Sequence, residues 1–183
     1  MVNERPTTTA EMNHVIKWVP PQAGCYKVNV DGAVFSKRKQ AGMGVVVRDG
    51  IGQEIAALCR KMYTLLGPLE TEAKAMEIGV TFAMELGVRD VTFEGDSLVI
   101  CNAIHCLTEA APSVQNVVTR IPKHVQDFHT FAFSHTKRQG NVLAHVLAQH
   151  AVNVEDFVVW LEECLGCIEH ACMHDVLSHS NSE

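Results

Sequence analysis

The amino-acid sequence predicts an α/β domain in which a mixed five-stranded sheet carries helices on both faces. Two observations lead to this fold class. Three strand-like segments follow one another over residues 25–62 and are joined by short turns, a pattern that predicts an antiparallel meander. Helical and strand-like segments then alternate over residues 68–172, which predicts that the later strands join the same sheet in parallel.

The first three expected strands are apolar runs bounded by turn residues. Residues 25–35 alternate between apolar and polar side chains, which predicts a strand with one buried face. Residues 42–48 and 53–62 are the second and third strands, and a turn at residues 49–52 separates them. In the first strand the apolar side holds Tyr26, Val28 and Val30, and the polar side holds Lys27, Asn29 and Asp31.

Helix-forming residues dominate the chain after the meander. Pro68 suits the first turn of a helix and Gly87 suits its end, so a helix is expected over residues 68–86. A strand over residues 88–93 follows and runs into Glu94-Gly95-Asp96-Ser97. The remaining expected elements are helices over residues 98–107, 113–125, 141–152 and 155–172 and a strand over residues 128–134.

Length and composition fit a single globular domain with polar ends. The 183 residues are 47% hydrophobic and 20% charged, values that are ordinary for a folded domain. We expect residues 1–17 to form a flexible N-terminal segment, residues 18–152 the domain, and residues 153–183 a C-terminal helix and polar tail. The net charge of −6 requires that any nucleic-acid surface be a local basic patch.

The sequence predicts neither a membrane protein nor a secreted one. It has no run of about 18 apolar residues, and its first residues lack the apolar core of a signal peptide. Its seven cysteines have no framework spacing, so we expect reduced thiols and an intracellular protein of the cytoplasm or nucleus. Cys164, Cys167, His170, Cys172 and His174 are spaced too closely for a common zinc finger, and packing on an amphipathic helix is favoured over a zinc site.

Three acidic residues lie in or at the ends of expected strands and helices. Asp31 lies in the first strand, Glu72 lies in the first turns of the first long helix, and Asp96 ends the fourth strand. Ligands of α/β sheets gather at such strand ends. Each acid also has a purely structural interpretation: a turn for Asp31, a favourable helix charge for Glu72 and a helix cap for Asp96.

Five short motifs carry the most specific signal in the sequence. They are Lys27–Ala33, Gly44–Asp49, Glu70–Ala75, Phe93–Ser97 and Asn141–Ala148. Any one of them is weak, but the ordered set resembles the type 1 ribonuclease H family, and most closely the retroelement-like ribonuclease H domains of plants. The resemblance covers residues 18–151 and implies the ribonuclease H-like fold.

The resemblance also implies a metal-dependent mechanism. The family holds two divalent cations, Mg²⁺ or Mn²⁺, on carboxylates, and such hard cations prefer oxygen ligands. By this resemblance Asp31 would bridge both ions, while Glu72 would hold the ion on the leaving-group side and Asp96 the ion that carries the attacking water. Glu70 is the nearest rival of Glu72, and His135 matches a mobile histidine that assists turnover and proton transfer.

The sequence departs from the family at the fourth ligand position. The family carries an aspartate four residues after the position of Asn141, and this chain has His145 there. A spacing of four places both residues on one face of a helix, so His145 still points to the expected site. Histidine binds metals but suits softer ions better than Mg²⁺. We therefore expect a metal preference shifted toward Mn²⁺.

Residues that could contact nucleic acid lie mostly in basic loops. The candidates are Lys37, Arg38, Lys39, Lys137 and Arg138, with Ser97 and Asn141 added from their motif positions. The family also discriminates RNA from DNA with polar side chains that contact 2′-hydroxyls. Here those positions hold Pro68, Leu69 and Leu98, which lack hydrogen-bonding side chains. We therefore expect weak, salt-sensitive binding to nucleic acid.

Two functions remain open from the sequence. The first is a metal-dependent endonuclease that cuts the RNA strand of RNA–DNA hybrids and leaves a 3′-hydroxyl and a 5′-phosphate. The second is a catalytically weak nucleic-acid-binding or protein-interaction module derived from the same fold. Intact Asp31, Glu72 and Asp96 favour the enzyme, while His145 and the acidic net charge favour the module. The oligomeric state is also open.

Overall fold

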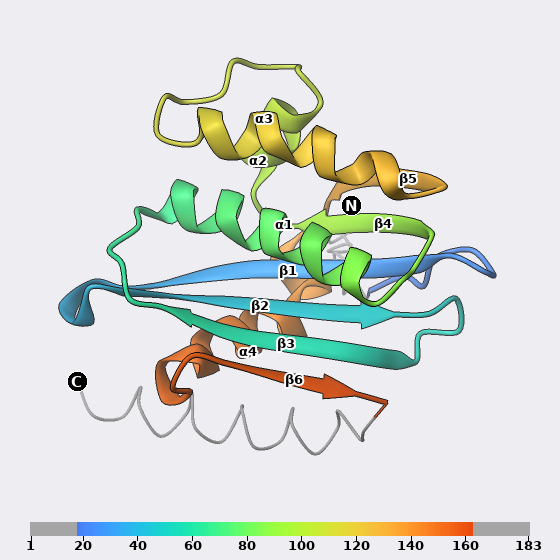
Figure 1. Cartoon of the computed structure of the whole chain (residues 1–183), viewed down its shortest axis with the longest axis horizontal. Coiled ribbons are helices and arrows are strands. Elements are labelled where there is room, and N and C mark those ends of the chain that lie inside the picture. The colour runs from blue at the N-terminus through green and yellow to red at the C-terminus, as the bar shows by residue number, and fades with distance from the viewer. Residues whose placement is uncertain (1–17, 163–183) are drawn as a thin grey trace, which may run out of the picture.

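A six-stranded mixed sheet forms the centre of the computed structural model, which describes residues 18–162 (Figure 1). Its strands are β1 (Tyr26–Phe35), β2 (Gln40–Arg48), β3 (Glu54–Met62), β4 (Asp90–Gly95), β5 (Thr130–His135) and β6 (Phe157–Leu161). The strand order across the sheet is β5-β4-β1-β2-β3-β6. β1, β2 and β3 pair antiparallel as a meander, whereas β4 is parallel to β1 and β5 is parallel to β4.

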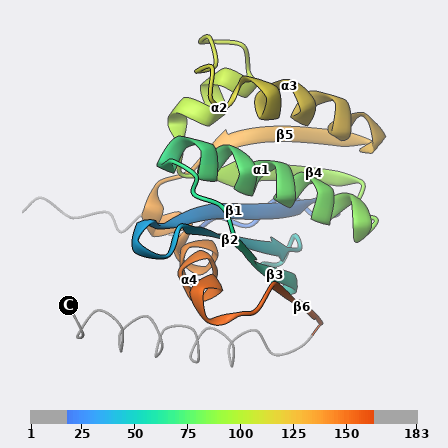
Figure 2. The same cartoon turned by 60° about the vertical axis from the view of Figure 1, so that its left-hand side comes forward.

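Helices cover both faces of this sheet. They are α1 (Pro68–Glu85), α2 (Leu98–Ile104), α3 (Gln115–His124) and α4 (Val142–His150). α1 lies on one face with α2 and α3 packed beside it, and α4 lies on the opposite face (Figure 2). No helix within residues 18–162 is both long and apolar enough to cross a membrane.

The predicted α/β fold with its meander and parallel strands is confirmed, but the predicted strand number and last helix are wrong. Residues 157–161, expected inside a helix over residues 155–172, form β6 and pair antiparallel with β3. The spacing of Val158 and Leu161 is compatible with a helix, yet the run is β-branched and aromatic and finds an open edge on β3. The rest of that expected helix, the C-terminal Cys/His cluster and residues 1–17 lie outside the described residues.

Both faces of the central strand β1 are buried, so the expected solvent-facing side of β1 is wrong. Val28 and Val30 pack in the larger core, under α1. A smaller core fills the space between the sheet and α4. On this second face Lys27, Asn29 and Asp31 are only 8%, 1% and 0% exposed. The start of α4 contacts Asn29 and Asp31, while Trp18 and Val19 lie against Lys27. A central strand with helices on both sides normally has two buried faces, and β1 therefore carries polar groups into the interior.

Helix α4 lies directly against the backbone of β2. A Cβ atom added at Gly44 would lie 2.1 Å from the carbonyl oxygen of Ala144 and 2.5 Å from the backbone nitrogen of Ala148. Only a residue without a side chain permits so close an approach. Gly44 is also the partner of Asp31 in the β1–β2 register, so this contact brings the first turns of α4 to the acid on β1.

Candidate metal centre

Two of the acidic residues meet because β1 and β4 are parallel neighbours. Their register pairs Val30 with Gly95. The next residue of each strand is an acid, so Asp31 and Asp96 stand at the same level of the sheet. β4 ends at this point and the chain turns toward α2, which is the kind of strand end where ligands bind in α/β sheets.

The first turn of α1 brings the third acid to the same place. A Cβ atom at Gly32 would lie 2.5 Å from Cγ2 of Thr71, so the helix begins in close contact with β1. The neighbouring acid Glu70 is used differently, because its carboxylate accepts a hydrogen bond from the backbone N–H of Gly67 at the start of the helix. Glu72 is therefore the acid of this turn that reaches the cluster.

Asp31, Glu72 and Asp96 form one cluster of carboxylates. One oxygen atom from each lies within 4.8 Å of the others. Burial, together with the negative charges of Asp31 and Asp96, raises the pKa of Glu72 to about 9, while the charge of Arg138 opposes this increase. Glu72 consequently keeps its proton at neutral pH in the metal-free protein, because burial and two neighbouring negative charges disfavour its ionised form.

The donor set of the cluster suits a divalent cation. Asp31 is fully buried, and its Oδ1 atom has no hydrogen-bond partner among the described residues. Such an unpartnered buried oxygen is costly to the fold. A hard cation such as Mg²⁺ or Mn²⁺ would satisfy it, since these ions prefer carboxylate oxygens. The three carboxylates can therefore hold a metal ion.

His145 lies beside the cluster on α4. Its Nδ1 atom is 2.6 Å from Oδ2 of Asp31, and the ring is partly exposed. Its backbone N–H donates to the carbonyl of Asn141 at 3.0 Å, which fixes it in the first turn of the helix. The imidazole thus faces the cluster at the position where the resemblance implies a fourth ligand.

Two residues from the end of β5 and the following turn contact Asp96. Nε2 of His135 is 3.2 Å from the backbone carbonyl oxygen of Asp96, and Nε of Arg138 is 3.4 Å from its Oδ2. The expected strand ended at residue 134, one residue before His135, but His135 is the last residue of β5 and is exposed. Both side chains therefore lie at the solvent edge of the cluster, on the Asp96 side.

The predicted basic contacts lie in two exposed turns. Residues 37–39, three consecutive basic residues, are exposed between β1 and β2. They begin six residues beyond Asp31, which corresponds to about 20 Å of extended chain. Lys137 is exposed next to Arg138 in the turn after β5. Positive charge therefore occurs beside the cluster, at Arg138, and in the turn that follows β1, at residues 37–39.

Ser97 and Asn141, the other two predicted nucleic-acid contacts, make hydrogen bonds within the chain. Ser97 caps α2, because its side chain accepts from the N–H of Ile100 at 3.5 Å. Asn141 is buried and its amide donates to the carbonyl of Val30 at 2.8 Å. This second bond ties the start of α4 to β1 beside Asp31. A contact of either side chain with nucleic acid stays a prediction.

A buried polar network beneath the cluster was missed by the sequence analysis. Oε1 of Glu94 pairs with Nζ of Lys27 at 2.9 Å, and its Oε2 accepts from the amide of Asn29 at 3.1 Å. The same amide donates to Oδ1 of Asn141 at 3.2 Å. Glu94 therefore neutralises Lys27 instead of joining Asp96 in the cluster. The alternating polar residues of β1 could have indicated this network, since a strand at the centre of the sheet has two buried faces and buried polar groups are normally hydrogen-bonded.

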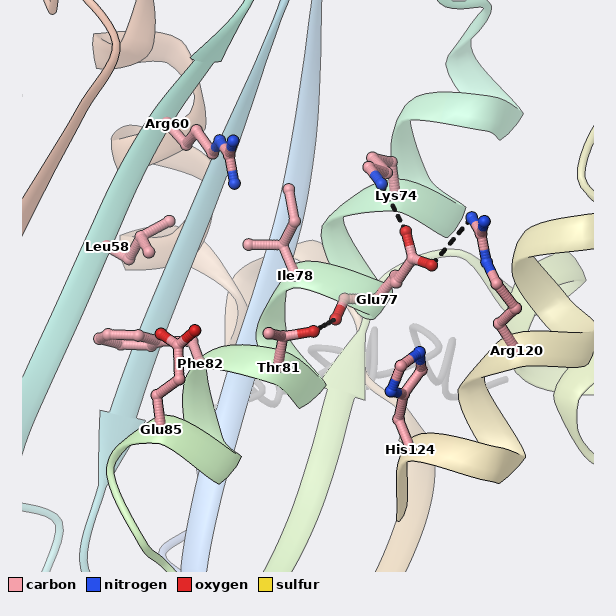
Figure 3. A pocket seen from close by; sticks show the side chains of 10 residues that line it. All are labelled: Leu58, Arg60, Lys74, Glu77, Ile78, Thr81, Phe82, Glu85, Arg120 and His124. Carbon is pink, nitrogen blue, oxygen red and sulfur yellow. Dashed lines mark hydrogen bonds and ion pairs between the residues drawn. The ribbon is translucent and has the colours of Figure 1, made fainter.

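A separate hollow of about 300 Å³ lies between β3, α1 and α3 (Figure 3). The buried Glu77 in this hollow is paired with Lys74 at 2.5 Å and with Arg120 at 2.9 Å. None of the three clustered acids lines it. Two basic side chains balance the charge of Glu77, whereas the carboxylates of the cluster lie beside one another and repel.

Several solved structures with a similar architecture are ribonucleases H. RNase H1 of the halophilic archaeon Halobacterium salinarum NRC-1 has a TM-score of 0.66 and 21% identity, over 70% of this chain and 98% of that chain. LC11-RNase H1 in complex with an RNA/DNA hybrid has a TM-score of 0.64 and 18% identity, over 70% and 96%. The N-terminal RNase H domain of a Mycobacterium tuberculosis protein gives 0.64 and 18%, over 70% and 94%. The fold is therefore ribonuclease H-like.

A sequence profile of the reverse transcriptase-like family matches residues 29–151, which include all three clustered acids. The chain belongs to this family, and the resemblance to ribonuclease H-like proteins expected from the motifs is confirmed. A protein of Arabidopsis thaliana that carries a provisional ribonuclease H name is 28% identical over 147 residues, or 80% of this chain. The chain spans 24% of that relative's length.

Proposed function

We propose that this chain is a divalent-metal-dependent endonuclease that hydrolyses the RNA strand of RNA–DNA hybrids and leaves a 3′-hydroxyl and a 5′-phosphate. One observation carries the proposal: Asp31, Glu72 and Asp96 converge on one point, and Asp31 offers a buried oxygen with no partner among the described residues. The ribonuclease H-like fold, shared with a neighbour that was solved in complex with an RNA/DNA hybrid, supports the substrate class.

Each carboxylate has a distinct task in this proposal. Asp31 is central and fully buried, so it would bridge two cations, while Glu72 and Asp96 would each hold one of them. Two bound Mg²⁺ or Mn²⁺ ions would activate a water and stabilise the leaving oxygen of an in-line displacement. Glu72 must release its proton as it becomes a ligand, because ligating carboxylates are deprotonated.

The solvent edge of the cluster would position the substrate. Arg138 places its guanidinium beside Asp96, where a phosphate that approaches the carboxylates needs a positive partner. His135 lies on the same side, where its Nε2–H donates to the backbone carbonyl of Asp96, so Nδ1 is the nitrogen that would take up and pass a proton there. Lys137 and residues 37–39 add local positive charge, which a chain of net charge −6 needs for phosphate binding.

The test is a gel assay of the full chain on an end-labelled RNA–DNA hybrid, with Mg²⁺ and with Mn²⁺. We expect the RNA strand to be cut in a metal-dependent manner and the DNA strand to stay intact. Removal of the metal with EDTA should stop the reaction, since the carboxylates alone supply no activated water. Absence of product in both metals, or equal cutting of both strands, would contradict the proposal.

A catalytically weak nucleic-acid-binding or protein-interaction module is the second candidate function. The contact of His145 Nδ1 with Asp31 Oδ2 favours it, because the imidazole occupies an oxygen that bridging cations need. Leu98, next to Ser97 at the site, is exposed and apolar. The same assay separates the two functions, since the module would retard a labelled hybrid on a native gel without cutting it in either metal.

We expect the metal preference of the enzyme to depend on His145. Nitrogen ligands suit Mn²⁺ better than Mg²⁺, so the parent chain should cleave faster in Mn²⁺. His145→Asp adds a charge and two oxygens and should raise the Mg²⁺ rate by about tenfold or more. His145→Ala should lower the rate in both metals. Single-turnover rates of the three proteins in each metal check this, and equal rates throughout would place His145 outside the chemistry.

A further inference from the structure

The outer edge of β6 is an unusual feature of this sheet. Within residues 18–162, no strand pairs with that side of β6. On its inner side, the N–H of Lys61 donates to the carbonyl of Asp156 at 2.7 Å, and the N–H of Glu162 donates to the carbonyl of Ile55 at 3.0 Å. These two hydrogen bonds determine which residues of β6 direct their backbone N–H and C=O groups toward β3 and which direct them outward.

Antiparallel bonding alternates along a strand, so Phe157, Val159 and Leu161 direct their backbone N–H and C=O groups away from β3. Their side chains share one face and are 56%, 37% and 53% exposed. Val158 is also exposed on the other face, while Trp160 packs against the smaller core. The strand contains no charge, proline or bulge, which are the usual protections of a sheet edge.

Acidic residues flank this apolar edge. Glu155 and Asp156 precede β6, Glu162 follows it, and all three are exposed. Two copies of β6 paired antiparallel about Val159 would set Asp156 of one chain against Glu162 of the other, and like charges in direct opposition are destabilising. Self-pairing over the full strand is therefore disfavoured. On the paired side of β6 the facing charges are opposite in sign, because Lys61 of β3 lies across from Asp156.

We propose that the outer edge of β6 binds an extended segment of a partner protein as a seventh strand. The chemistry of the edge specifies that segment: apolar side chains alternate at its centre, and lysine or arginine stands at each end. Main-chain hydrogen bonds to an open edge are a general way of binding such peptides. β6 is three strands from β1, or about 14 Å, so the partner would leave the metal centre accessible.

The experiment uses the full chain and two fluorescent peptides. Both have the same centre of alternating valine and threonine, with paired lysines at the ends of one peptide and paired glutamates at the ends of the other. We expect the lysine peptide to bind at least about tenfold more tightly by fluorescence anisotropy. Its binding should slow amide hydrogen exchange at Phe157, Val159 and Leu161, because these N–H groups become bonded.

Two sets of variants make the assignment specific. Val159→Pro removes an outward N–H without touching the bonds to β3, since proline is tolerated at an edge on its solvent side. It should abolish binding, whereas Val159→Thr, which keeps the N–H, should bind like the parent. Asp156→Lys combined with Glu162→Lys should reverse the preference and favour the glutamate peptide. Denaturant unfolding of each variant verifies that the domain is folded.

Several outcomes overturn the proposal. Equal binding of both peptides would mean non-specific apolar association, and no binding of either would exclude a strand-adding partner of this charge. Slow exchange at Val159 before any peptide is added would show that the edge is already covered. A dependence of that slow exchange on protein concentration would identify a second copy of the chain, and no dependence would identify the chain's own residues 163–183. None of these readouts requires cleavage activity.

Discussion

Asp31→Asn is expected to abolish metal-dependent cleavage of the hybrid while the domain stays folded. Asparagine has the size of aspartate and offers an oxygen to His145, but it lacks the charge and the second carboxylate oxygen that would bridge two cations. Loss of this central ligand should lower the single-turnover rate in Mg²⁺ by about 10³-fold or more. The free energy of unfolding should not fall, because the substitution removes a buried negative charge from a cluster of three acidic residues.

Glu77→Gln is the matched control for this experiment. Glu77 is also a buried acid, but it lies in the hollow of Figure 3, where its charge is paired with Lys74 and Arg120. Its substitution should leave the cleavage rate within about twofold of the parent, because it touches no clustered acid. Circular dichroism and denaturant unfolding of both variants separate lost chemistry from lost folding. A folded Asp31→Asn protein with parental activity in Mg²⁺ would refute the proposed function.

Glu72→Gln is expected to make the metal-free protein more stable at alkaline pH while it removes activity. The fold raises the pKa of Glu72 from an ordinary 4.5 to about 9. Between these values the folded protein holds a proton that the unfolded chain has released, so its stability falls as pH rises. Glutamine is neutral throughout this window. At pH 8 the variant should therefore exceed the parent by up to about 5 kcal/mol in free energy of unfolding.

Denaturant unfolding in EDTA across pH 5 to about 9 tests this expectation. The parent and Glu72→Gln should have similar stabilities near pH 5 and should separate progressively above it. Glu85→Gln, an exposed acid at the end of the same helix, should follow the parent at every pH. Excess Mg²⁺ should stabilise the parent by displacing the proton of Glu72, and it should stabilise the variant less. Parallel pH profiles for parent and variant would mean that Glu72 carries no unfavourable charge in the fold.

Local sequence patterns were sufficient to predict the order of the elements and the candidate acids. Alternation over residues 25–35 marked β1, and helix-forming residues between Pro68 and Gly87 marked α1. These signals are local, because a strand repeats every two residues and a helix about every 3.6. The convergence of the acids was expected from the order of the motifs and the resemblance that they carry, whereas the parallel pairing of β1 with β4 that brings two of them together came from the structure.

The failure at β6 has a different origin. Its five residues fit both a strand and a short helical stripe, and such runs are ambiguous in sequence. The choice depends on β3, which lies about a hundred residues earlier and offers the backbone partners that a strand needs. No pattern within the segment itself contains that information.

Contacts between distant residues decided the rest of the site. Asn29 meets Glu94 across 65 positions, and Asp31 meets His145 across 114. The first contact makes a seemingly solvent-facing side of β1 a buried, paired network. The second exists because Gly44 lets the backbone of α4 lie on the sheet at the level of Asp31. Periodicity assigns a residue to a face, but only the packing of the helices determines what covers that face and which charged groups become neighbours there.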